Sequence, residues 1–339
     1  MKILFLLKSK NAPSSRIRIK NLLPYLTKEG IDSDFEVIPK SGLQRLKLFR
    51  SCRNYDLVVL QKKLFGLLDL NILRFFTKKL IYDFDDAVYC KDAACSKNIL
   101  DYNNPARGRK FVRTIQKCDA VIAANNVLKN KAISVIDKNK ITVINSPIPI
   151  RIITQKSSYA ISGNPIIGWV GTKSTQKYLK YIEPALQIVN KTIPITLNII
   201  SNIKPEIKHI KLNYIEWSSK TEYQDIKIFD IGIMPLSDDP FSSGKAAYKL
   251  LQYMAAGIPS VCSNVGMNAE LSNIGNICLG GNTHEEFADA IIKLIQSESL
   301  RKNLGEKASE YVSKNFSYET ISKQYIDIFK KLRDCKIIN

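Results

Sequence analysis

Short, continuous apolar runs alternate with helical patterns along the chain, and this alternation constrains the fold more than any other feature. Strands that are apolar throughout, with helices between them, are typical of parallel sheets covered on both faces. Segments 16–28 and 107–117 have the helical pattern in the first half. The first half therefore predicts a doubly wound α/β domain. Its expected strands are Ile3 to Leu7, Leu57 to Leu60, Leu80 to Tyr82, Ala120 to Ala123 and Ile141 to Ile144.

The second half repeats this rhythm after a break. The sequence Asn-Ser-Pro-Ile-Pro at 145–149 and the mostly polar stretch 154–164 interrupt the pattern, so we place the interdomain linker there. A chain of 339 residues is also too long for one compact core. We expect strands at 166–170, 196–200, 229–234, 260–262 and 277–279, and helices at 175–190, 245–256, 284–297 and 300–315.

Three segments are expected from this organisation. They are an N-terminal domain over 1–155, a C-terminal domain over 156–317, and a last segment over 318–339 that packs back across the domains. The last segment is amphipathic over 318–332, with its apolar residues at helical spacing. These apolar residues are Ile321, Tyr325, Ile328 and Phe329.

The chain carries a large and unevenly distributed positive charge. It has 51 Lys and Arg against 31 Asp and Glu, which gives a formal charge of +20. Residues 1–150 hold 28 basic and 13 acidic side chains, so +15 of this charge lies in the first half. Such a surplus favours an acidic partner, which could be nucleic acid, anionic lipid or a phosphorylated substrate. We expect that partner to meet the N-terminal domain.

The cysteines and histidines indicate the cellular compartment and limit the kinds of metal or catalytic site that the chain could form. Seven cysteines without a C-x-x-C pair argue against a disulfide scaffold and a zinc site, and favour a reducing cytosol. His209 and His284 are the only histidines, too few for a His-based metal site or a serine triad. The apolar run at 3–7 stops at Lys8, short of the roughly 7 to 15 residues of a signal-peptide core.

The strongest site pattern lies at 229–259, where an apolar strand leads through small residues into a helix. The loop is made of Ser and Gly at 242–244, and the helix is expected to begin near Lys245 and to end at Gly257. Free N–H groups and the dipole at a helix start favour phosphate. Lys245 and Lys249, one turn apart, would add two cations on one face. A plain helix start with two solvated lysines is the alternative.

This segment resembles the C-terminal signature of glycosyltransferase family 4 and its relatives. Phe229 to Leu236 is similar to the family pattern aDvgimPl, and Gln252 to Val261 is similar to EAMAxGxPVV. The resemblance covers most of the chain and is strongest over 166–332. It implies the GT-B fold, in which two Rossmann-like doubly wound domains face a central cleft. The similarity continues through Asn264 to Glu270 and the helices at 300–315 and 318–332.

The resemblance also places donor-binding residues. Family members usually have two glutamates here, one at the sugar hydroxyls and one at the ribose, but this chain has Gly244 and Gln252 at those positions. The Gln252 amide can still bind a ribose. Gly244 cannot replace a carboxylate, so sugar recognition is expected from Asp238 or Asp239 and the loop backbone. The expected substrate-binding residues in this region are Asp239, Ser243, Gly244, Ala246, Lys249, Gln252 and Glu270.

A second donor-side element follows the strand at 166–170. In the family, an Arg directly after a Gly and a Lys five residues further on bind the diphosphate. Here Gly171 is followed by Thr172 in place of the Arg, while Lys177 keeps the Lys. A strand, a Gly and a helix start still favour a phosphate contact. We therefore expect Gly171, Thr172 and Lys177 to bind the donor diphosphate.

Three carboxylates crowd the end of the third expected strand, at Asp83, Asp85 and Asp86. An Asp-x-Asp pair could bind a metal or serve a haloacid-dehalogenase-type phosphatase, although such a phosphatase has Thr or Val where this chain has Ala87. By resemblance, the last two lie where the family often has a His-Asp pair facing the donor sugar. GT-B enzymes generally stabilise the leaving diphosphate without a metal. We expect Asp85, Asp86 and Lys245 to be catalytic, with no metal and no cofactor. A helix cap or loop brace is the alternative for the pair.

Two arginines follow the first expected strand, in the sequence Ser14-Ser15-Arg16-Ile17-Arg18, where the family often has a Gly-rich loop. Arg16 and Arg18 could hold a phosphate of the donor or acceptor through charge-assisted hydrogen bonds. A solvated helix start is the alternative.

Basic residues stand beside apolar ones in segment 43–53 and around segment 64–76. This mixture suits the surface of an anionic bilayer, and core-facing helices with basic outer faces are the alternative. No uncharged apolar run approaches the roughly 18 residues of a membrane-spanning helix. Any membrane contact is therefore expected to be peripheral, at the inner face.

These patterns predict a GT-B glycosyltransferase that binds a nucleotide diphosphate sugar mainly through its C-terminal half. The acceptor would be a lipid-diphosphate-linked or otherwise anionic glycan bound by the basic N-terminal half, as in surface-polysaccharide assembly. The resemblance implies retention of the anomeric configuration by front-face attack, with the diphosphate helping to take the acceptor proton.

Two alternative functions remain. One is a nucleic-acid-binding protein, although no zinc spacing, RNA-binding aromatic motif or helix-turn-helix pattern supports it. The other is a catalytically inactive nucleotide-sugar-binding scaffold, which would explain the missing glutamates.

Overall fold

The fold is described from a computed structural model, which covers residues 1–91 and 102–334. The chain divides into two compact units. The N-terminal unit contains residues 1–147, 244–246 and the chain from Tyr318 onward. The C-terminal unit contains residues 148–243 and 247–317. The first division falls between Pro147 and Ile148, inside the stretch where the sequence loses its strand and helix rhythm.

The N-terminal unit is built on a parallel six-stranded sheet with the strand order β2-β1-β3-β4-β5-β6. Its strands are β1 (Lys2–Leu7), β2 (Asp32–Val37), β3 (Leu57–Gln61), β4 (Leu80–Phe84), β5 (Ala120–Ala123) and β6 (Ile141–Val143). Its helices are α1 (Pro13–Ser15), α2 (Leu23–Lys28), α3 (Gly42–Ser51), α4 (Leu67–Phe76), α5 (Pro105–Gln116), α6 (Asn126–Ile133) and α13 (Tyr318–Asp334), with a π-helical turn at Arg16–Lys20.

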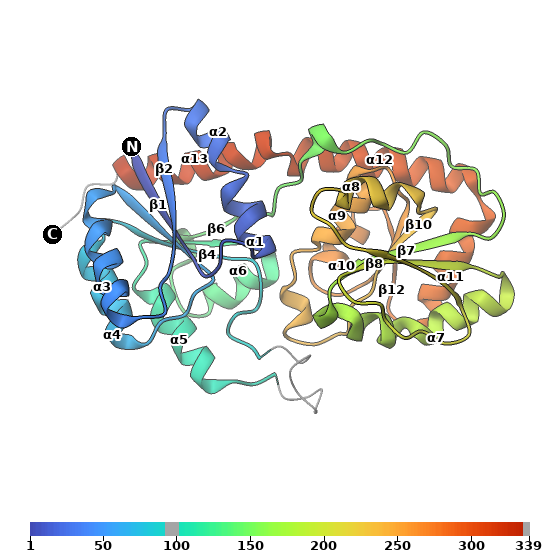
Figure 1. The fold of residues 1–339 in the computed structure, drawn as a ribbon, viewed down its shortest axis with the longest axis horizontal. Coiled ribbons are helices and arrows are strands. Elements are labelled where there is room, and N and C mark those ends of the chain that lie inside the picture. The colour runs from blue at the N-terminus through green and yellow to red at the C-terminus, as the bar shows by residue number, and fades with distance from the viewer. Residues whose placement is uncertain (92–101, 335–339) are drawn as a thin grey trace. The chain divides into compact units, whose positions relative to one another are not determined.

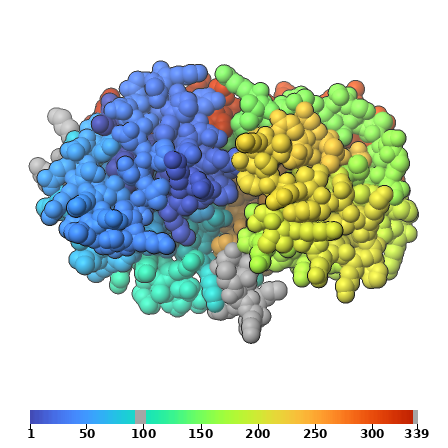
Figure 2. All heavy atoms as spheres, viewed as in Figure 1, coloured from blue at the N-terminus to red at the C-terminus, as the bar shows by residue number. Residues whose placement is uncertain are grey.

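Both faces of this sheet are covered, and the residues of its central strands are buried apart from Lys2. Alternate residues such as Phe5 pack with Tyr325 and Phe329 of α13 in one cluster. On the other face, Phe84 of β4 packs edge-on against Phe111 of α5. Figure 1 shows α13 beside α2 in this unit, and little of α13 is visible on the face drawn in Figure 2. The prediction of an amphipathic final helix is confirmed.

The C-terminal unit has a second parallel six-stranded sheet, with the order β12-β11-β10-β7-β8-β9. Its strands are β7 (Ile166–Gly171), β8 (Thr196–Ser201), β9 (Lys211–Glu216), β10 (Ile231–Met234), β11 (Ser260–Ser263) and β12 (Leu279–Gly281). Its helices are α7 (Gln176–Thr192), α8 (Glu222–Asp225), α9 (Tyr248–Ala255), α10 (Met267–Ser272), α11 (His284–Gln296) and α12 (Glu298–Phe316). Helices α7 and α11 cover one face, and α9 and α12 cover the other (Figure 1).

Each sheet has a point where the strand order reverses. In the N-terminal unit this switch point lies between β1 and β3, and in the C-terminal unit it lies between β7 and β10. Open α/β sheets bind ligands beyond the carboxyl ends of the strands at such a point. The switch points therefore mark where each unit is expected to bind a small molecule. The doubly wound α/β prediction is confirmed for both halves.

The predicted strands and helices differ from the observed ones in two informative ways. Strands β2 and β9 were not predicted, because each lies at a sheet edge and its residues alternate between partly exposed and exposed positions. The prediction that a helix begins near Lys245 is wrong. Helix α9 begins at Tyr248, because Ala247 before it adopts a left-handed backbone conformation with φ 48°. Lys245 and Lys249 are therefore not one helical turn apart.

Candidate functional site

An acidic cluster lies at the carboxyl end of β4 in the N-terminal unit. Asp85 and Asp86 follow the strand, and Lys62 follows the neighbouring strand β3. The Lys62 Nζ lies 2.8 Å from Asp85 Oδ1 and also contacts an oxygen of Asp86. Lys62 takes a left-handed backbone conformation, with φ 55°, and its N–H donates to the Asp83 carbonyl at 2.9 Å. The sequence analysis did not select Lys62. Its position could have indicated a site residue, because it is a cation directly after the buried strand β3, which pairs with β4.

Burial and ion pairing act in opposite directions within this cluster. Burial raises the pKa of Asp85, and the nearby Asp86 adds to that rise against the opposing effect of Lys62. Burial also works to raise the pKa of Asp86, but Lys62 and Lys245 outweigh it and hold that pKa below its ordinary value. Burial works to lower the pKa of Lys62, yet the two carboxylates raise it above its usual range. Lys62 therefore opposes the effect of burial on both close carboxylates.

Replacing Lys62 with Met is expected to make the stability of the protein fall as pH rises. Without Lys62, burial and the charge of Asp86 raise the pKa of Asp85 further, so the folded state keeps a proton there that the unfolded state releases above its ordinary carboxyl pKa. Stability then decreases with rising pH wherever the folded state binds more protons. We expect a loss of about 3–5 kcal/mol at pH 7 and a smaller loss at pH 5, measured by urea unfolding. The control is Lys47→Met, because Lys47 is exposed on α3. An equal loss at both pH values in Lys62→Met would contradict this role.

Residues 244–246 belong to the N-terminal unit and lie beside the acidic cluster. The Lys245 Nζ lies 3.9 Å from Asp86 Oδ1. Asn125, which follows β5 and caps α6, donates from its side-chain amide to the carbonyls of Gly244 at 3.2 Å and Lys245 at 3.0 Å. The structure thus brings together the three residues predicted to be catalytic. The sequence analysis did not select Asn125, although the two asparagines at 125 and 126 follow a buried strand and could have indicated it.

The prediction that Arg18 binds a substrate phosphate is contradicted. Arg18 has no exposed surface, and its guanidinium donates to both oxygens of Asp83, at 3.0 and 2.9 Å. It also donates to the Ile144 carbonyl at 2.9 Å. The turn at Arg16–Lys20 directs the Arg18 side chain inward, so Arg18 braces the unit from inside. Arg16 is partly exposed at the same turn, and its substrate contact stays a prediction.

In the C-terminal unit, the loop after β10 is built around Asp239. This carboxylate is buried, and it accepts from the N–H groups of Phe241 at 2.9 Å and Ser242 at 2.8 Å. It also accepts from the hydroxyls of Ser237 and Ser242. Burial works to raise the pKa of Asp239, but these hydrogen bonds hold it below its ordinary value. Asp239 therefore shapes the loop, and the expected contact with the sugar stays a prediction.

The loop after β7 and the start of α9 form a cluster of cations and aromatic rings at the β7/β10 switch point. The Lys249 Nζ lies 3.2 Å from the Thr175 hydroxyl and 5.2 Å from the centre of the Trp169 ring. The Lys177 Nζ lies 4.8 Å from the Tyr178 ring centre. The Tyr178 hydroxyl shares a hydrogen bond of 2.7 Å with Ser242. Segments far apart in sequence thus present two lysines at the carboxyl ends of neighbouring strands.

Gly171 and Thr172, which were also predicted to bind the diphosphate, have defined conformations. Gly171 ends β7, and a Cβ at this position would lie 1.8 Å from a Trp169 ring atom, so only glycine fits. Thr172 caps the 3₁₀ turn Lys173–Thr175, and its N–H donates to the Thr175 hydroxyl at 2.8 Å. Thr172 is exposed and open to a ligand from solvent. Thr175, Trp169 and Tyr178 were missed by the sequence analysis.

The remaining predicted donor residues lie on α9 and α10 and in the loops that precede them. Gln252 is buried on α9, and Glu270 is partly exposed in the first turn of α10. The Ser243 hydroxyl donates to the Asp239 carbonyl at 2.8 Å. Gly266, with φ 57°, lets its backbone approach the Ser243 carbonyl, which would lie 2.2 Å from a Cβ. The roles of Gln252 and Glu270 toward a substrate stay predictions.

Two further findings concern metals and membranes. Within residues 1–91 and 102–334, no three His, Cys, Asp or Glu side chains gather in a way that could hold a metal ion. In the same parts of the chain, every helix is too short or too polar to cross a bilayer.

The family comparison matches a segment that lies within the C-terminal unit. Residues 153–311 match the family described as glycosyl transferases group 1. An uncharacterised glycosyltransferase of Methanocaldococcus jannaschii is 25% identical over 331 residues, which cover 88% of this chain and 83% of the relative. Both observations concern the sequence, and they agree with the fold.

Solved structures extend the likeness over both units. Sucrose-phosphate synthase from Thermosynechococcus elongatus has a TM-score of 0.78 at 14% identity and covers 99% of this chain and 100% of its own. The Anabaena protein HepE, solved with UDP and glucose, has a TM-score of 0.72 at 16% identity, covering 98% of this chain and 100% of its own. These likenesses show that the chain has the GT-B fold.

Proposed function

We propose that this protein transfers a sugar from a nucleotide diphosphate sugar to an anionic, lipid-linked glycan acceptor. Residues 153–311 match the group 1 glycosyltransferases, and the chain has the GT-B fold. The observation that carries the proposal is the cluster at the β7/β10 switch point. There, Lys177 and Lys249 approach the end of β7 beside a loop braced by Asp239. Basic side chains at such a switch point suit a diphosphate.

The donor is proposed to bind to the C-terminal unit. Lys177 and Lys249 neutralise the diphosphate, with Thr172 and the backbone at Gly171 and Ser243 nearby. Gln252 is the proposed ribose partner, and Glu270 is a further donor contact. Because Asp239 is engaged by four hydrogen bonds, its proposed role is to position the loop that meets the sugar. The UDP in HepE makes UDP the first nucleotide to test.

The proposed reaction needs no nucleophile from the protein. The acceptor hydroxyl attacks the anomeric carbon on the face from which the diphosphate leaves. The new bond from carbon to the acceptor oxygen forms as the bond to the phosphate oxygen breaks, and the hydroxyl proton passes to the departing diphosphate. The anomeric configuration is retained. Asp85 and Asp86, both paired with Lys62, stabilise positive charge on the sugar or hold its hydroxyls, and Lys245 adds positive charge toward the diphosphate.

The acceptor is proposed to bind to the N-terminal unit, which carries most of the positive charge. Arg16 is a proposed contact there. Helix α3 carries the exposed side chains of Leu43 and Arg50, and α4 carries the exposed side chain of Leu68. This combination supports peripheral contact with the inner face of an anionic membrane and a role in surface-polysaccharide assembly.

A thermal-shift screen of UDP, GDP and dTDP tests the donor proposal. At least one nucleoside diphosphate is expected to raise the Tm, because a ligand at one hundred times its Kd stabilises the folded state by about 2.7 kcal/mol. The matching nucleoside monophosphate is the control, and we expect a smaller shift because it lacks the second phosphate. If no nucleoside diphosphate raised the Tm, the proposal would be contradicted. A salt-sensitive affinity for DNA or RNA in its place would favour a nucleic-acid-binding protein.

A further inference from the structure

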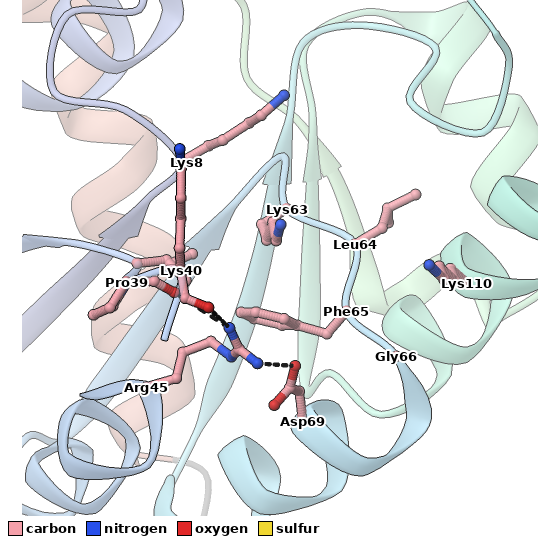
Figure 3. Close-up of a pocket in the computed structure, with 11 residues that line it drawn as sticks. Lys8, Pro39, Lys40, Arg45, Lys63, Leu64, Phe65, Gly66, Asp69 and Lys110 are labelled. Atoms are coloured by element: carbon pink, nitrogen blue, oxygen red, sulfur yellow. Dashed lines mark hydrogen bonds and ion pairs between the residues drawn. The ribbon is translucent and has the colours of Figure 1, made fainter. Parts of the chain in front are cut away.

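The N-terminal unit contains a cavity that none of the predicted site residues lines. Its volume is about 420 Å³, within the size range of small-molecule sites. It lies beyond the carboxyl ends of β2, β1 and β3, so it includes the β1/β3 switch point of this sheet. Figure 3 shows the side chains that surround it. The lining residues that matter here are Lys8, Lys40, Arg45, Lys63, Phe65 and Lys110.

The charges around this cavity are strongly unbalanced. Four lysines and one arginine line it, and Asp69 is the one carboxylate among the lining residues. Asp69 is already paired with Arg45, at 3.1 Å. Burial lowers the pKa of Lys63, and the like charges of Lys8, Arg45 and Lys110 lower it further, against a weaker opposing effect of Asp69. The cavity thus holds positive charges that an anionic ligand would relieve.

Part of the cavity wall is held rigidly. The Arg45 guanidinium donates to the carbonyls of Lys40 at 2.8 Å and Pro39 at 3.3 Å, and the dashed lines in Figure 3 mark these contacts and the ion pair with Asp69. Phe65 is 3% exposed and packs edge-on against Phe49 of α3, with ring centres 5.4 Å apart. The segment after β2, helix α3 and the start of α4 are therefore tied together around one opening.

Exposed apolar side chains adjoin the lining residues in the chain. Leu67 and Leu68 lie between Gly66 and Asp69, and they are 50% and 75% exposed. Leu43 lies two residues before Arg45 and is 67% exposed. These three leucines are thus exposed and close in sequence to residues that line the cavity.

We propose that this cavity binds the diphosphate of a lipid-linked acceptor, with the lipid chain lying against Leu43, Leu67 and Leu68. Lys63 and Lys40 contact the phosphate oxygens, and Arg45 fixes the shape of the wall. This inference rests on the proposed glycosyltransferase function and gives its acceptor a specific site. The diphosphate of the acceptor then binds to a different unit from the diphosphate of the donor.

Titration calorimetry with two probes tests this site. Geranyl diphosphate and inorganic pyrophosphate are added to the full chain in the presence of a saturating nucleoside diphosphate, which occupies the donor site. Geranyl diphosphate is expected to bind more tightly than pyrophosphate because of its apolar chain. Equal affinities would overturn the lipid part of the proposal, and no binding of either probe would overturn the proposal as a whole.

The variant Lys40→Gln/Lys63→Gln is expected to bind geranyl diphosphate at least about tenfold more weakly, since each loss removes a charge-assisted contact. Lys47→Gln is the control, because Lys47 lies on α3 and does not line the cavity. Its affinity should match the wild type. Unchanged affinity in the double variant would overturn the assignment. Nucleotide binding is measured in every variant, so failure of the donor site is detected separately from failure of this one.

Discussion

Arg18→Met is expected to lower the free energy of unfolding by about 3–5 kcal/mol, because it leaves the buried Asp83 carboxyl without its cationic partner inside the N-terminal unit. Both side chains have no exposed surface, and the guanidinium donates to both carboxylate oxygens. The Tyr325 hydroxyl donates to the same carboxylate at 2.6 Å, so the pair also joins α13 to β4. Burial works to lower the pKa of Arg18, but Asp83 and the other neighbours raise it above its usual value.

Urea unfolding of the variant, followed by circular dichroism, measures this loss. Arg50→Met is the control, because Arg50 is exposed on α3, and such surface changes usually alter stability by no more than about 0.5 kcal/mol. A variant that is fully unfolded at 25 °C also agrees with the expected direction. If Arg18→Met were as stable as Arg50→Met, the buried network would not support the unit, and Arg18 would again be open to a substrate role.

Replacing both Lys177 and Lys249 with Ala is expected to weaken binding of the nucleoside diphosphate by about a hundredfold or more. Each charge-assisted contact contributes about 1.5–3 kcal/mol, and tenfold in Kd corresponds to about 1.4 kcal/mol. The Lys249 ammonium lies over Trp169 and next to Thr175, and Lys177 lies in the first turn of α7. Their loss should leave the folded core intact, because neither side chain is fully buried.

Titration calorimetry with the best nucleoside diphosphate measures the change. Lys180→Ala is the matched control, since Lys180 is exposed one turn further along α7. Lys245→Ala should have a smaller effect on nucleotide binding and a larger effect on turnover, because Lys245 lies with Asp86 in the other unit. A double variant that binds the nucleotide as tightly as Lys180→Ala would show that the donor site lies elsewhere.

The fold was predictable because most of its strands are buried on both faces. Strand β5 has the predicted bounds, and β3 and β8 each extend one residue beyond them. The edge strand β2 has the sequence Asp-Ser-Asp-Phe-Glu-Val and β9 has Lys-Leu-Asn-Tyr-Ile-Glu, so neither forms a continuous apolar run. An edge strand faces water along one side, and its hydrophobic signal is correspondingly weak.

The sequence predicted which segments form the candidate site, but it predicted the positions and partners of their side chains much less well. The loops after β4, β7 and β10 were identified from residues at the ends of apolar runs. That Arg18 points inward, however, depends on the π-helical turn at 16–20 and on an acceptor in β4, sixty-five residues away. Likewise, the left-handed Ala247 shortens α9 in a way that no local pattern indicates. Pairings such as Lys62 with Asp85 arise only when neighbouring parallel strands end at one edge of the sheet.

The most direct test of the central claim is a transfer assay with a panel of UDP, GDP and dTDP sugars and a diphosphate-linked lipid acceptor. We predict that one donor releases its nucleoside diphosphate together with an equal amount of glycosylated lipid, and that Asp86→Asn lowers this rate while leaving nucleotide affinity unchanged. If the folded protein bound a nucleoside diphosphate but transferred no sugar from any donor, the proposed catalytic role of Asp85, Asp86 and Lys245 would be contradicted, and the protein would be a nucleotide-sugar-binding scaffold.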